Sequence, residues 1–154
     1  MSSSIEEIFE GHWRDDMSRK KVLIVDDAPL MRMVIMNMLK GDPKLEVVGK
    51  AKNGAEALKM LPSHSPDLVL LDIEMPLMDG LTFLRHARAN FPGKILVLSA
   101  VTGLGSAKAV EATKLGADGI ITKPSGNVSL DLEAKRGSEL TRKIYEVLEL
   151  GSPV

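Results

Sequence analysis

The stretch "PDLVLLDIEMPLMDGLTFL" at residues 66–84 decides the fold. It contains an apolar run at residues 67–71, stops abruptly at Asp72, and passes through a Pro and an Asp-Gly pair into a helical pattern. A short continuous apolar run of this kind is typical of a strand buried on both faces of a parallel sheet. The question is why such a strand should end on a carboxylate.

Strand patterns alternate with helical patterns along the whole chain. The predicted strands are residues 21–25, 45–49, 67–71, 94–98 and 119–122. The predicted helices are residues 29–40, 54–61, 79–90, 106–116 and 138–149. Pro29 suits a first helical turn and Gly116 a C-cap, while "LPSHSP" (61–66) and "KPSGNVS" (123–129) indicate loops. Five strands alternating with helices predict an α/β fold with a parallel sheet and right-handed crossovers.

Composition excludes several classes of protein. The net charge of −1 argues against a nucleic-acid or polybasic membrane surface, and the apolar runs are too short to span a bilayer. The absence of cysteine excludes a disulfide scaffold and a thiolate metal site. Residues 1–16 carry acids and lack an apolar segment, so they are no signal peptide. We expect a cytoplasmic protein that binds neither nucleic acid nor membrane.

The chain length fits one domain with flanking segments. We expect a disordered N-terminal extension at residues 1–17, a domain at 18–150 and a tail at 151–154. The extension contains the chain's one tryptophan, Trp13, and Met17 could serve as an alternative start.

Polar residues follow four of the five predicted strands. Asp26 and Asp27 follow the first strand, Asp72 the third, Ser99 the fourth and Lys123 the fifth. Each alone has a simpler interpretation, such as a helix cap, a core hydroxyl or a surface lysine. Because the carboxyl ends of parallel strands meet at one edge of the sheet, where ligands bind, we expect them to converge.

Three neighbouring carboxylates repel one another, and a divalent cation relieves that repulsion. With oxygen ligands alone, Mg²⁺ is the expected ion, and Mn²⁺ and Ca²⁺ are alternatives. A carboxylate can also act as a nucleophile and form an aspartyl phosphate. Lys123 and the Ser99 hydroxyl would then stabilise charge on the phosphoryl oxygens.

Four stretches together resemble the receiver domain of two-component response regulators. They are "VLIVDDAPLMRMVI", "PDLVLLDIEMPLMDGLTFL", "ILVLSA" and "KLGADGIITKP", and the resemblance covers about residues 20–150. It implies the family's fold, a flavodoxin-like doubly wound five-stranded parallel sheet of order 2-1-3-4-5 with helices on both faces. Any one of the four stretches alone would be weak support.

The resemblance assigns metal ligands residue by residue. Asp27 and Asp72 would bind Mg²⁺ through their carboxylates, and Asp26 would act nearby, largely through water. Glu74 would contribute its backbone carbonyl.

The resemblance also assigns the phosphoryl site. Asp72 would be the phosphoacceptor, Ser99 the switch hydroxyl and Lys123 the contact to the phosphoryl group, with a cis bond to Pro124. The switch position three residues before the lysine, usually Tyr or Phe, is Ile120. The aromatic rotation described for the family therefore cannot operate in this chain.

The implied function is a phospho-accepting receiver with no enzymatic activity beyond phosphoryl transfer to its own aspartate. A sensor histidine kinase would donate the phosphoryl group. The output surface of fourth helix, fifth strand and fifth helix would bind a downstream protein or effector domain, with homodimerisation on phosphorylation left open.

Residues 99–132, "SAVTGLGSAKAVEATKLGADGIITKPSGNVSLDL", resemble the receiver half of chemotaxis methylesterases. A "GxSTGG" nucleophile turn is absent, so the alternative is a regulatory fragment without its catalytic domain. A small aspartate-nucleophile phosphatase and an interaction module that no longer takes phosphate are weaker alternatives.

The first predicted helix contains an unusual run of methionines. We expect Met31, Met33, Met36 and Met38 to pack in the core more than to form a binding surface.

Overall fold

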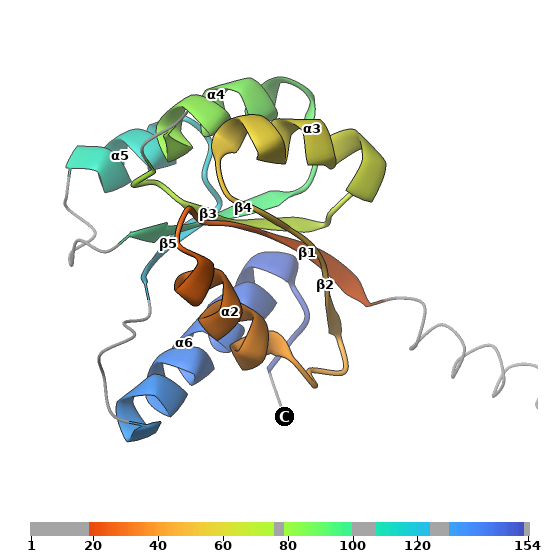
Figure 1. Ribbon diagram of the computed structural model, residues 1–154, viewed down its shortest axis with the longest axis vertical. Coiled ribbons are helices and arrows are strands. Elements are labelled where there is room, and N and C mark those ends of the chain that lie inside the picture. The colour runs from red at the N-terminus through yellow and green to blue at the C-terminus, as the bar shows by residue number, and fades with distance from the viewer. Residues whose placement is uncertain (1–18, 76–78, 100–106, 124–129, 153–154) are drawn as a thin grey trace, which may run out of the picture.

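The computed structural model describes residues 19–75, 79–99, 107–123 and 130–152, with the backbone alone at residues 130–138. Five parallel strands form one sheet of order β2-β1-β3-β4-β5 (Figure 1). The strands are β1 (Lys20–Val25), β2 (Leu45–Ala51), β3 (Leu68–Asp72), β4 (Lys94–Ser99) and β5 (Gly119–Thr122). This confirms the expected flavodoxin-like order.

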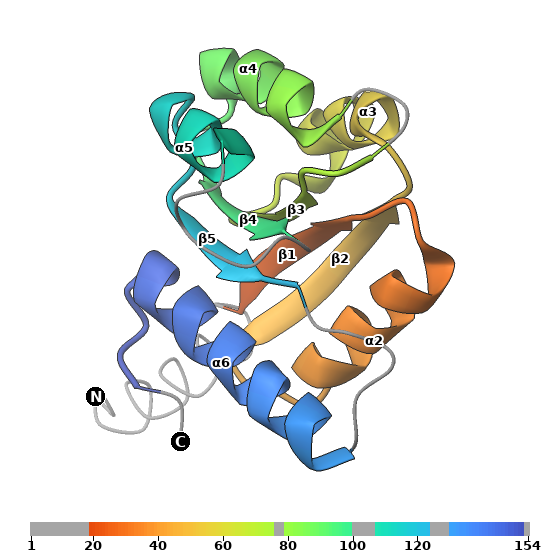
Figure 2. The same ribbon diagram turned by 90° about the vertical axis from the view of Figure 1, so that its left-hand side faces the viewer.

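Helices cover both faces of the sheet. They are α2 (Pro29–Leu39), α3 (Gly54–His64), α4 (Gly80–Asn90), α5 (Ala107–Lys114) and α6 (Leu130–Leu148). Helices α3, α4 and α5 lie on one face, and α2 and α6 lie on the other (Figures 1 and 2). Among the described residues, no helix combines the length and apolar character needed to cross a membrane.

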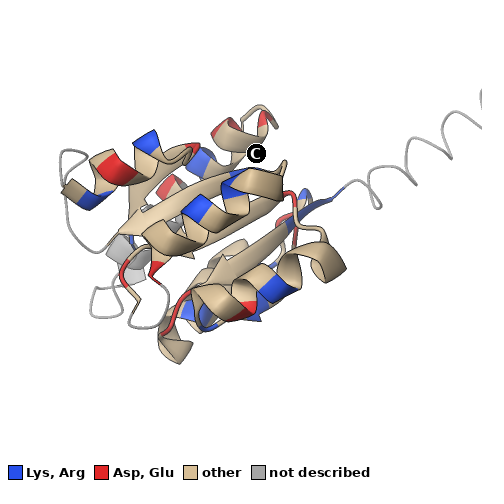
Figure 3. Ribbon diagram, turned by 90° about the horizontal axis from the view of Figure 1, so that it is seen from above, with Lys and Arg blue, Asp and Glu red and all other residues tan. Residues whose placement is uncertain are grey.

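Two apolar layers result because successive strand residues point to opposite faces. On β1, Leu23 and Val25 pack toward α3, α4 and α5, while Val22 and Ile24 pack toward α2 and α6. All four are buried, as the continuous apolar run predicts. Burial of each such side chain contributes about 1.5–3 kcal/mol. Charged residues of both signs are spread over the helices outside these layers (Figure 3).

Two helix boundaries differ from the sequence prediction by more than two residues. Helix α3 continues past Pro62 to His64, so the first half of the predicted loop at 61–66 is wrong. Leu58 and Leu61 pack against the core, and this burial outweighs the backbone hydrogen bond that the proline removes. Helix α6 begins at Leu130 instead of residue 138, because one interior glycine costs only about 1 kcal/mol and does not end a helix.

The methionine prediction is wrong for one residue. Met31, Met36 and Met38 pack partly buried against the layer beneath α2 and α6, as expected. Met33 is 55% exposed, and Leu30 beside it is 63% exposed. The helical periodicity therefore turns these two side chains away from the sheet.

Gly80 lets the first turn of α4 lie directly on the end of β3. A Cβ at this position would meet Ile73 Cα and would lie 2.7 Å from the Asp72 carbonyl oxygen. Both are backbone atoms, so neither can move aside cheaply. The close approach fixes the chain around Asp72.

Tyr145 joins α6 to the loop that follows α2. It is 3% exposed, and its hydroxyl donates a 2.7 Å hydrogen bond to Asp42 Oδ1. Burial first, and then the hydrogen bond and charge of Asp42, raise the pKa of Tyr145 to about 12. The folded state therefore retains the phenolic proton more strongly than an unfolded chain does.

We predict that Gly80→Ala lowers the free energy of unfolding by about 1–3 kcal/mol, because the added methyl group overpacks against backbone. Urea denaturation measures the change. Gly49→Ala is the matched control, since its Cβ would first meet Met60 Cε, the flexible end of a side chain, at 2.6 Å. Equal losses in the two variants would contradict the interpretation.

We predict that the phenol of Tyr145 titrates well above 10.0, near 12, and that Asp42→Asn lowers this value. Tyr145 is the chain's single tyrosine, so phenolate absorbance reports it alone. The folded pKa is the higher one, so the stabilisation is complete below about pH 10 and is lost as the pH rises toward 12. Between these values the wild type should lose stability relative to Tyr145→Phe. A normal titration would refute the coupling.

Candidate functional site

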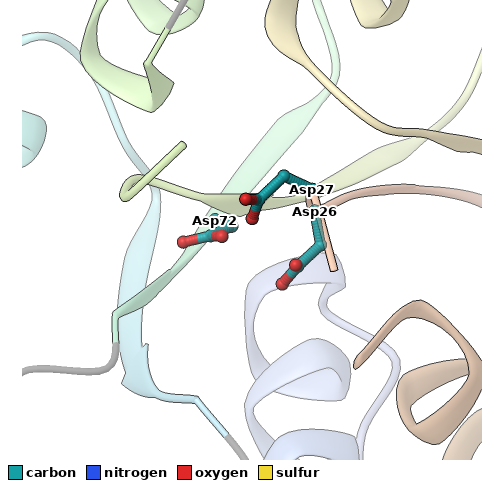
Figure 4. Close-up of side chains that lie close together, drawn as sticks. All are labelled: Asp26, Asp27 and Asp72. Atoms are coloured by element: carbon teal, nitrogen blue, oxygen red, sulfur yellow. The ribbon is translucent and has the colours of Figure 1, made fainter. Parts of the chain in front are cut away.

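The polar residues that end the strands meet at one edge of the sheet. Asp72 ends β3 and Ser99 ends β4, while Asp26 and Lys123 directly follow β1 and β5. The parallel register aligns these ends, since Val25 pairs with Leu71 and Ser99 with Thr122. One carboxylate oxygen from each of Asp26, Asp27 and Asp72 lies within 4.8 Å of the other two (Figure 4).

Asp26 is fully buried and is held by its own turn. Its Oδ1 accepts a 2.9 Å hydrogen bond from the Ala28 amide, which directs the chain from β1 into α2. Its Oδ2 makes no hydrogen bond in the described structure, although Lys123 Nζ lies 3.1 Å away. A buried carboxylate oxygen without a hydrogen bond is costly unless another charged partner compensates it. Asp27, the next residue, is exposed at the mouth of the cluster.

Asp72 is fully buried and accepts two hydrogen bonds. The Glu74 amide donates to Oδ1 at 2.8 Å, and Lys123 Nζ donates to Oδ2 at 2.9 Å. Burial raises the pKa of Asp72 to about 6, with a further contribution from the negative charge of Asp26. These effects outweigh the two hydrogen bonds, which favour the ionised form. Keeping the Asp72 side chain ionised in the folded protein therefore costs free energy.

Lys123 links two of the buried carboxylates. Although burial lowers the pKa of an ammonium, the hydrogen bond and charge of Asp72 and the charge of Asp26 raise the pKa of Lys123 overall. Its backbone amide donates a 2.8 Å hydrogen bond to the Ser99 carbonyl, which joins the ends of β5 and β4. The Lys123 side chain thus reaches the two carboxylates from the end of β5, a third strand besides β1 and β3.

The structure brings together most of the residues chosen from the sequence. Asp26, Asp27, Asp72 and Lys123 form one cluster. Ser99 is buried at the adjacent strand end, and Glu74 contacts Asp72 through its amide. The expected cis bond involves Pro124, which lies outside the described residues.

Sequence reasoning missed Arg32. Its Nη1 donates a 2.6 Å hydrogen bond to the Asp26 carbonyl, from one turn inside α2. A positive charge six residues after Asp26, on the helix that begins at Pro29, was the available signal. Arg32 braces the end of β1 and adds a cation near the carboxylates.

The cluster fits a hard divalent cation. Its available ligands are carboxylate oxygens, which Mg²⁺, Mn²⁺ and Ca²⁺ prefer, and no histidine belongs to the described cluster. Three carboxylates face one ammonium, so Lys123 alone leaves negative charge uncompensated. Asp26 Oδ2 offers a buried oxygen without a hydrogen bond, toward a cation or one of its bound waters.

The comparisons with known proteins agree on one family. The family model described as the response regulator receiver domain matches residues 22–135. A protein-glutamate methylesterase/protein-glutamine glutaminase of Halalkalibacterium halodurans is 50% identical over 119 residues, which are 77% of this chain and 34% of that protein. The chain spans about a third of the length of the curated relatives it matches.

Solved structures give the same result. The response regulator domain of Thermotoga maritima CheB has a TM-score of 0.77 and 36% identity, covering 85% of this chain and 97% of that one. A chain in the crystal structure of the P1 domain of CheA3 in complex with CheY6 from R. sphaeroides has a TM-score of 0.73 and 47% identity, and the match covers 86% of this chain and 98% of that one.

We predict that Asp72→Asn is more stable than the wild type at neutral pH in EDTA. The folded pKa of about 6 exceeds the ordinary 3.8, so stabilisation by the protonated carboxyl is complete below about pH 4 and lost as the pH rises through 6. Asparagine carries no charge and keeps an acceptor for the Glu74 amide. The gap should reach about 1–3 kcal/mol at neutral pH.

Urea unfolding of both proteins across this pH range measures the effect. Asp67→Asn is the matched control, because Asp67 lies just before the other end of β3 and accepts from the Lys21 amide. A gap for Asp72→Asn that does not grow with pH would show that burial of the charge is not the cause.

Proposed function

Because the chain belongs to the response regulator receiver domain family, we propose that it is a signalling switch that accepts a phosphoryl group on Asp72. The group comes from a sensor histidine kinase in the cytoplasm. The observation that carries this proposal is the Lys123 ammonium, 2.9 Å from Asp72 Oδ2 and 3.1 Å from Asp26 Oδ2. It supports the proposal because a buried carboxylate able to act as a nucleophile lies beside an ammonium and further carboxylates, at the edge where ligands bind to parallel sheets.

The proposed ion is Mg²⁺. The carboxylates of Asp27 and Asp72 and the backbone carbonyl of Glu74 would hold it, with Asp26 acting largely through water. When bound, it supplies positive charge that neutralises the carboxylates and the phosphoryl oxygens. The uncompensated charge of the three carboxylates supports this assignment.

The proposed transfer needs little chemistry from the protein beyond positioning. One carboxylate oxygen of Asp72 forms the new bond to phosphorus as the bond between phosphorus and the donor's histidine nitrogen breaks. The electron pair of that bond stays on the imidazole. Lys123 is placed to stabilise charge on the phosphoryl oxygens, and Ser99 lies at the adjacent strand end to donate its hydroxyl. In this proposal the chain catalyses phosphoryl transfer to its own Asp72 and to no other acceptor.

We propose two kinds of partner, a kinase that donates the phosphoryl group and a target that binds the output surface. A similar solved structure contains the P1 domain of CheA3 with CheY6, which supports a kinase as donor. Exposed Leu30 and Met33 lie on α2, the helix that begins three residues after Asp26, and offer apolar contact to such a donor. The output surface is α5, β5 and α6, for a downstream protein, an effector domain or a second phosphorylated copy.

Ile120 on β5 constrains how that surface responds. It is partly buried and packs against the core layer beneath α3, α4 and α5. An aliphatic side chain has no aromatic ring to rotate, so the response has to pass through Lys123, Ser99 and the backbone of β5. This distinguishes the chain from receivers that carry Tyr or Phe at the position.

A second candidate is a regulatory role within a chemotaxis methylesterase. The 50% identity to a methylesterase, of which this chain covers 34%, favours it. The receiver chemistry is the same, and the output would be an attached catalytic domain. The mass of the native protein detected in cell extract by an antibody to this domain tests it, since an intact methylesterase would be about three times longer.

We predict that acetyl phosphate with Mg²⁺ adds one phosphoryl group per chain, detected by intact-mass spectrometry. Asp72→Asn and EDTA should each abolish the adduct, because they remove the nucleophile and the cation. Asp67→Asn, the same change just before the opposite end of β3, should retain it.

Two outcomes would contradict the proposal. One is an adduct that persists in Asp72→Asn, which would place the phosphoryl group elsewhere. The other is a folded wild type that takes phosphate neither from acetyl phosphate nor from a phosphorylated kinase P1 domain.

A further inference from the structure

The turn after β1 carries two of the three clustered carboxylates, and Arg32 ties this turn to helix α2. Asp26 is held at its amide, its side chain and its carbonyl. The amide donates a 3.0 Å hydrogen bond to the Ala51 carbonyl at the end of β2, and Oδ1 accepts from the Ala28 amide at 2.9 Å. The carbonyl accepts the 2.6 Å hydrogen bond from Arg32 Nη1. The backbone of Asp26 is therefore fixed from β2, from its own turn and from α2.

Asp27 depends on this turn for its own position. It is exposed, and within the part of the chain that the structure describes its carboxylate makes no hydrogen bond or ion pair. One of its oxygens nevertheless lies within 4.8 Å of an oxygen of Asp26 and of Asp72 (Figure 4). The Asp26 carbonyl belongs to the planar peptide unit that joins Asp26 to Asp27. A contact that holds this carbonyl therefore also orients the backbone from which the Asp27 carboxylate projects.

Helix stability does not account for an arginine at this position. Arg32 is the fourth residue of α2, at the end of a first turn that contains no acidic residue. The N-terminal end of a helix dipole is positive, so a cation there is unfavourable for the helix. Among the described residues no acidic side chain forms an ion pair with Arg32. Its hydrogen bond to the Asp26 carbonyl is the contact that its position provides.

We propose that Arg32 is a positioning residue for the divalent cation. The inference rests on the proposed function, because it requires Asp27 and Asp72 to bind Mg²⁺. Arg32 holds the peptide unit between Asp26 and Asp27, so the Asp27 carboxylate is directed toward Asp72 before the ion arrives. A ligand that is already oriented loses less freedom on binding than one that has to be ordered. Arg32 acts through Asp27 and not by contact with the ion.

The charge of Arg32 has the opposite effect on cation binding. A positive charge near the carboxylates weakens their attraction for a second cation. Removal of the guanidinium therefore weakens Mg²⁺ binding if Arg32 positions Asp27, and strengthens it if Arg32 acts only through its charge. The sign of the change in Mg²⁺ affinity distinguishes the two roles.

Isothermal titration calorimetry with Mg²⁺ measures this sign. Arg32→Met removes the hydrogen-bond donor and the charge, and we expect its Mg²⁺ affinity to be about 10-fold lower than that of the wild type, as when a residue that orients a metal ligand is removed. Arg32→Lys should bind Mg²⁺ more tightly than Arg32→Met, because its ammonium can donate to the same carbonyl. At saturating Mg²⁺, Arg32→Met should take the phosphoryl group from acetyl phosphate at close to the wild-type rate.

Arg142→Met is the matched control. It removes the same charge from an exposed position on α6, at the same face of the sheet as α2 (Figure 1). Its Mg²⁺ affinity should equal that of the wild type, and circular dichroism verifies that all the variants remain folded.

Four results would overturn the inference and leave the proposed function in place. They are an Arg32→Met affinity equal to or above that of the wild type, an Arg32→Lys affinity no higher than that of Arg32→Met, an equal loss in Arg142→Met, and a rate in Arg32→Met that stays low at saturating Mg²⁺. A folded wild type that neither binds Mg²⁺ nor accepts a phosphoryl group would refute the proposed function itself, and the inference with it.

Discussion

The ion pairs of Lys123 with Asp72 and Asp26 are the interaction on which the site depends. A parallel sheet brings the carboxyl ends of its strands to one edge, and in this chain three of those ends deliver two buried carboxylates and one ammonium. Without the ammonium, two buried negative charges would face each other at an edge with restricted access to water. Removing Lys123 would leave both buried carboxylates without a counter-charge, and breaking a buried pair in this way costs about 3–5 kcal/mol, so Lys123 has a structural role before any chemistry begins.

The rest of the fold supports this unfavourable arrangement of charge. Apolar layers on both faces bury all of β3 and the carboxyl-terminal parts of β1 and β4, which keeps the strand ends in register. Gly80 allows α4 to close over the end of β3, and Arg32 braces the end of β1. The side chains of Asp26 and Asp72 each accept a hydrogen bond from the backbone amide two residues later in the chain. The carboxylates whose burial is unfavourable therefore also stabilise the turns that follow β1 and β3.

Sequence patterns predicted the architecture because the determinants are local. Continuous apolar runs marked the five strands, and the residue after each run identified the edge that Asp26, Asp72 and Lys123 share. Helix ends were harder to predict. Pro62 and Gly137 each disfavour a helix locally, but tertiary packing can outweigh that cost. The exposure of Met33, the hydrogen bond from Arg32 and the double pairing of Lys123 depend on three-dimensional placement, which spacing along the chain does not specify.

The electrostatics of the edge also define what a phosphoryl group on Asp72 would change. Phosphorylation would replace the single negative charge of the Asp72 carboxylate by an acyl phosphate of about −1.5 to −2, so a cluster in which one ammonium already faces three carboxylates would gain about half to one negative charge. Lys123 cannot satisfy Asp26 and a new dianionic group equally, so its position has to shift toward the greater charge. Its backbone amide is bonded to the Ser99 carbonyl, and Ile120 lies three residues before it in the core. A phosphoryl group that drew Lys123 toward it would therefore act on the ends of β4 and β5 together, with no aromatic ring required.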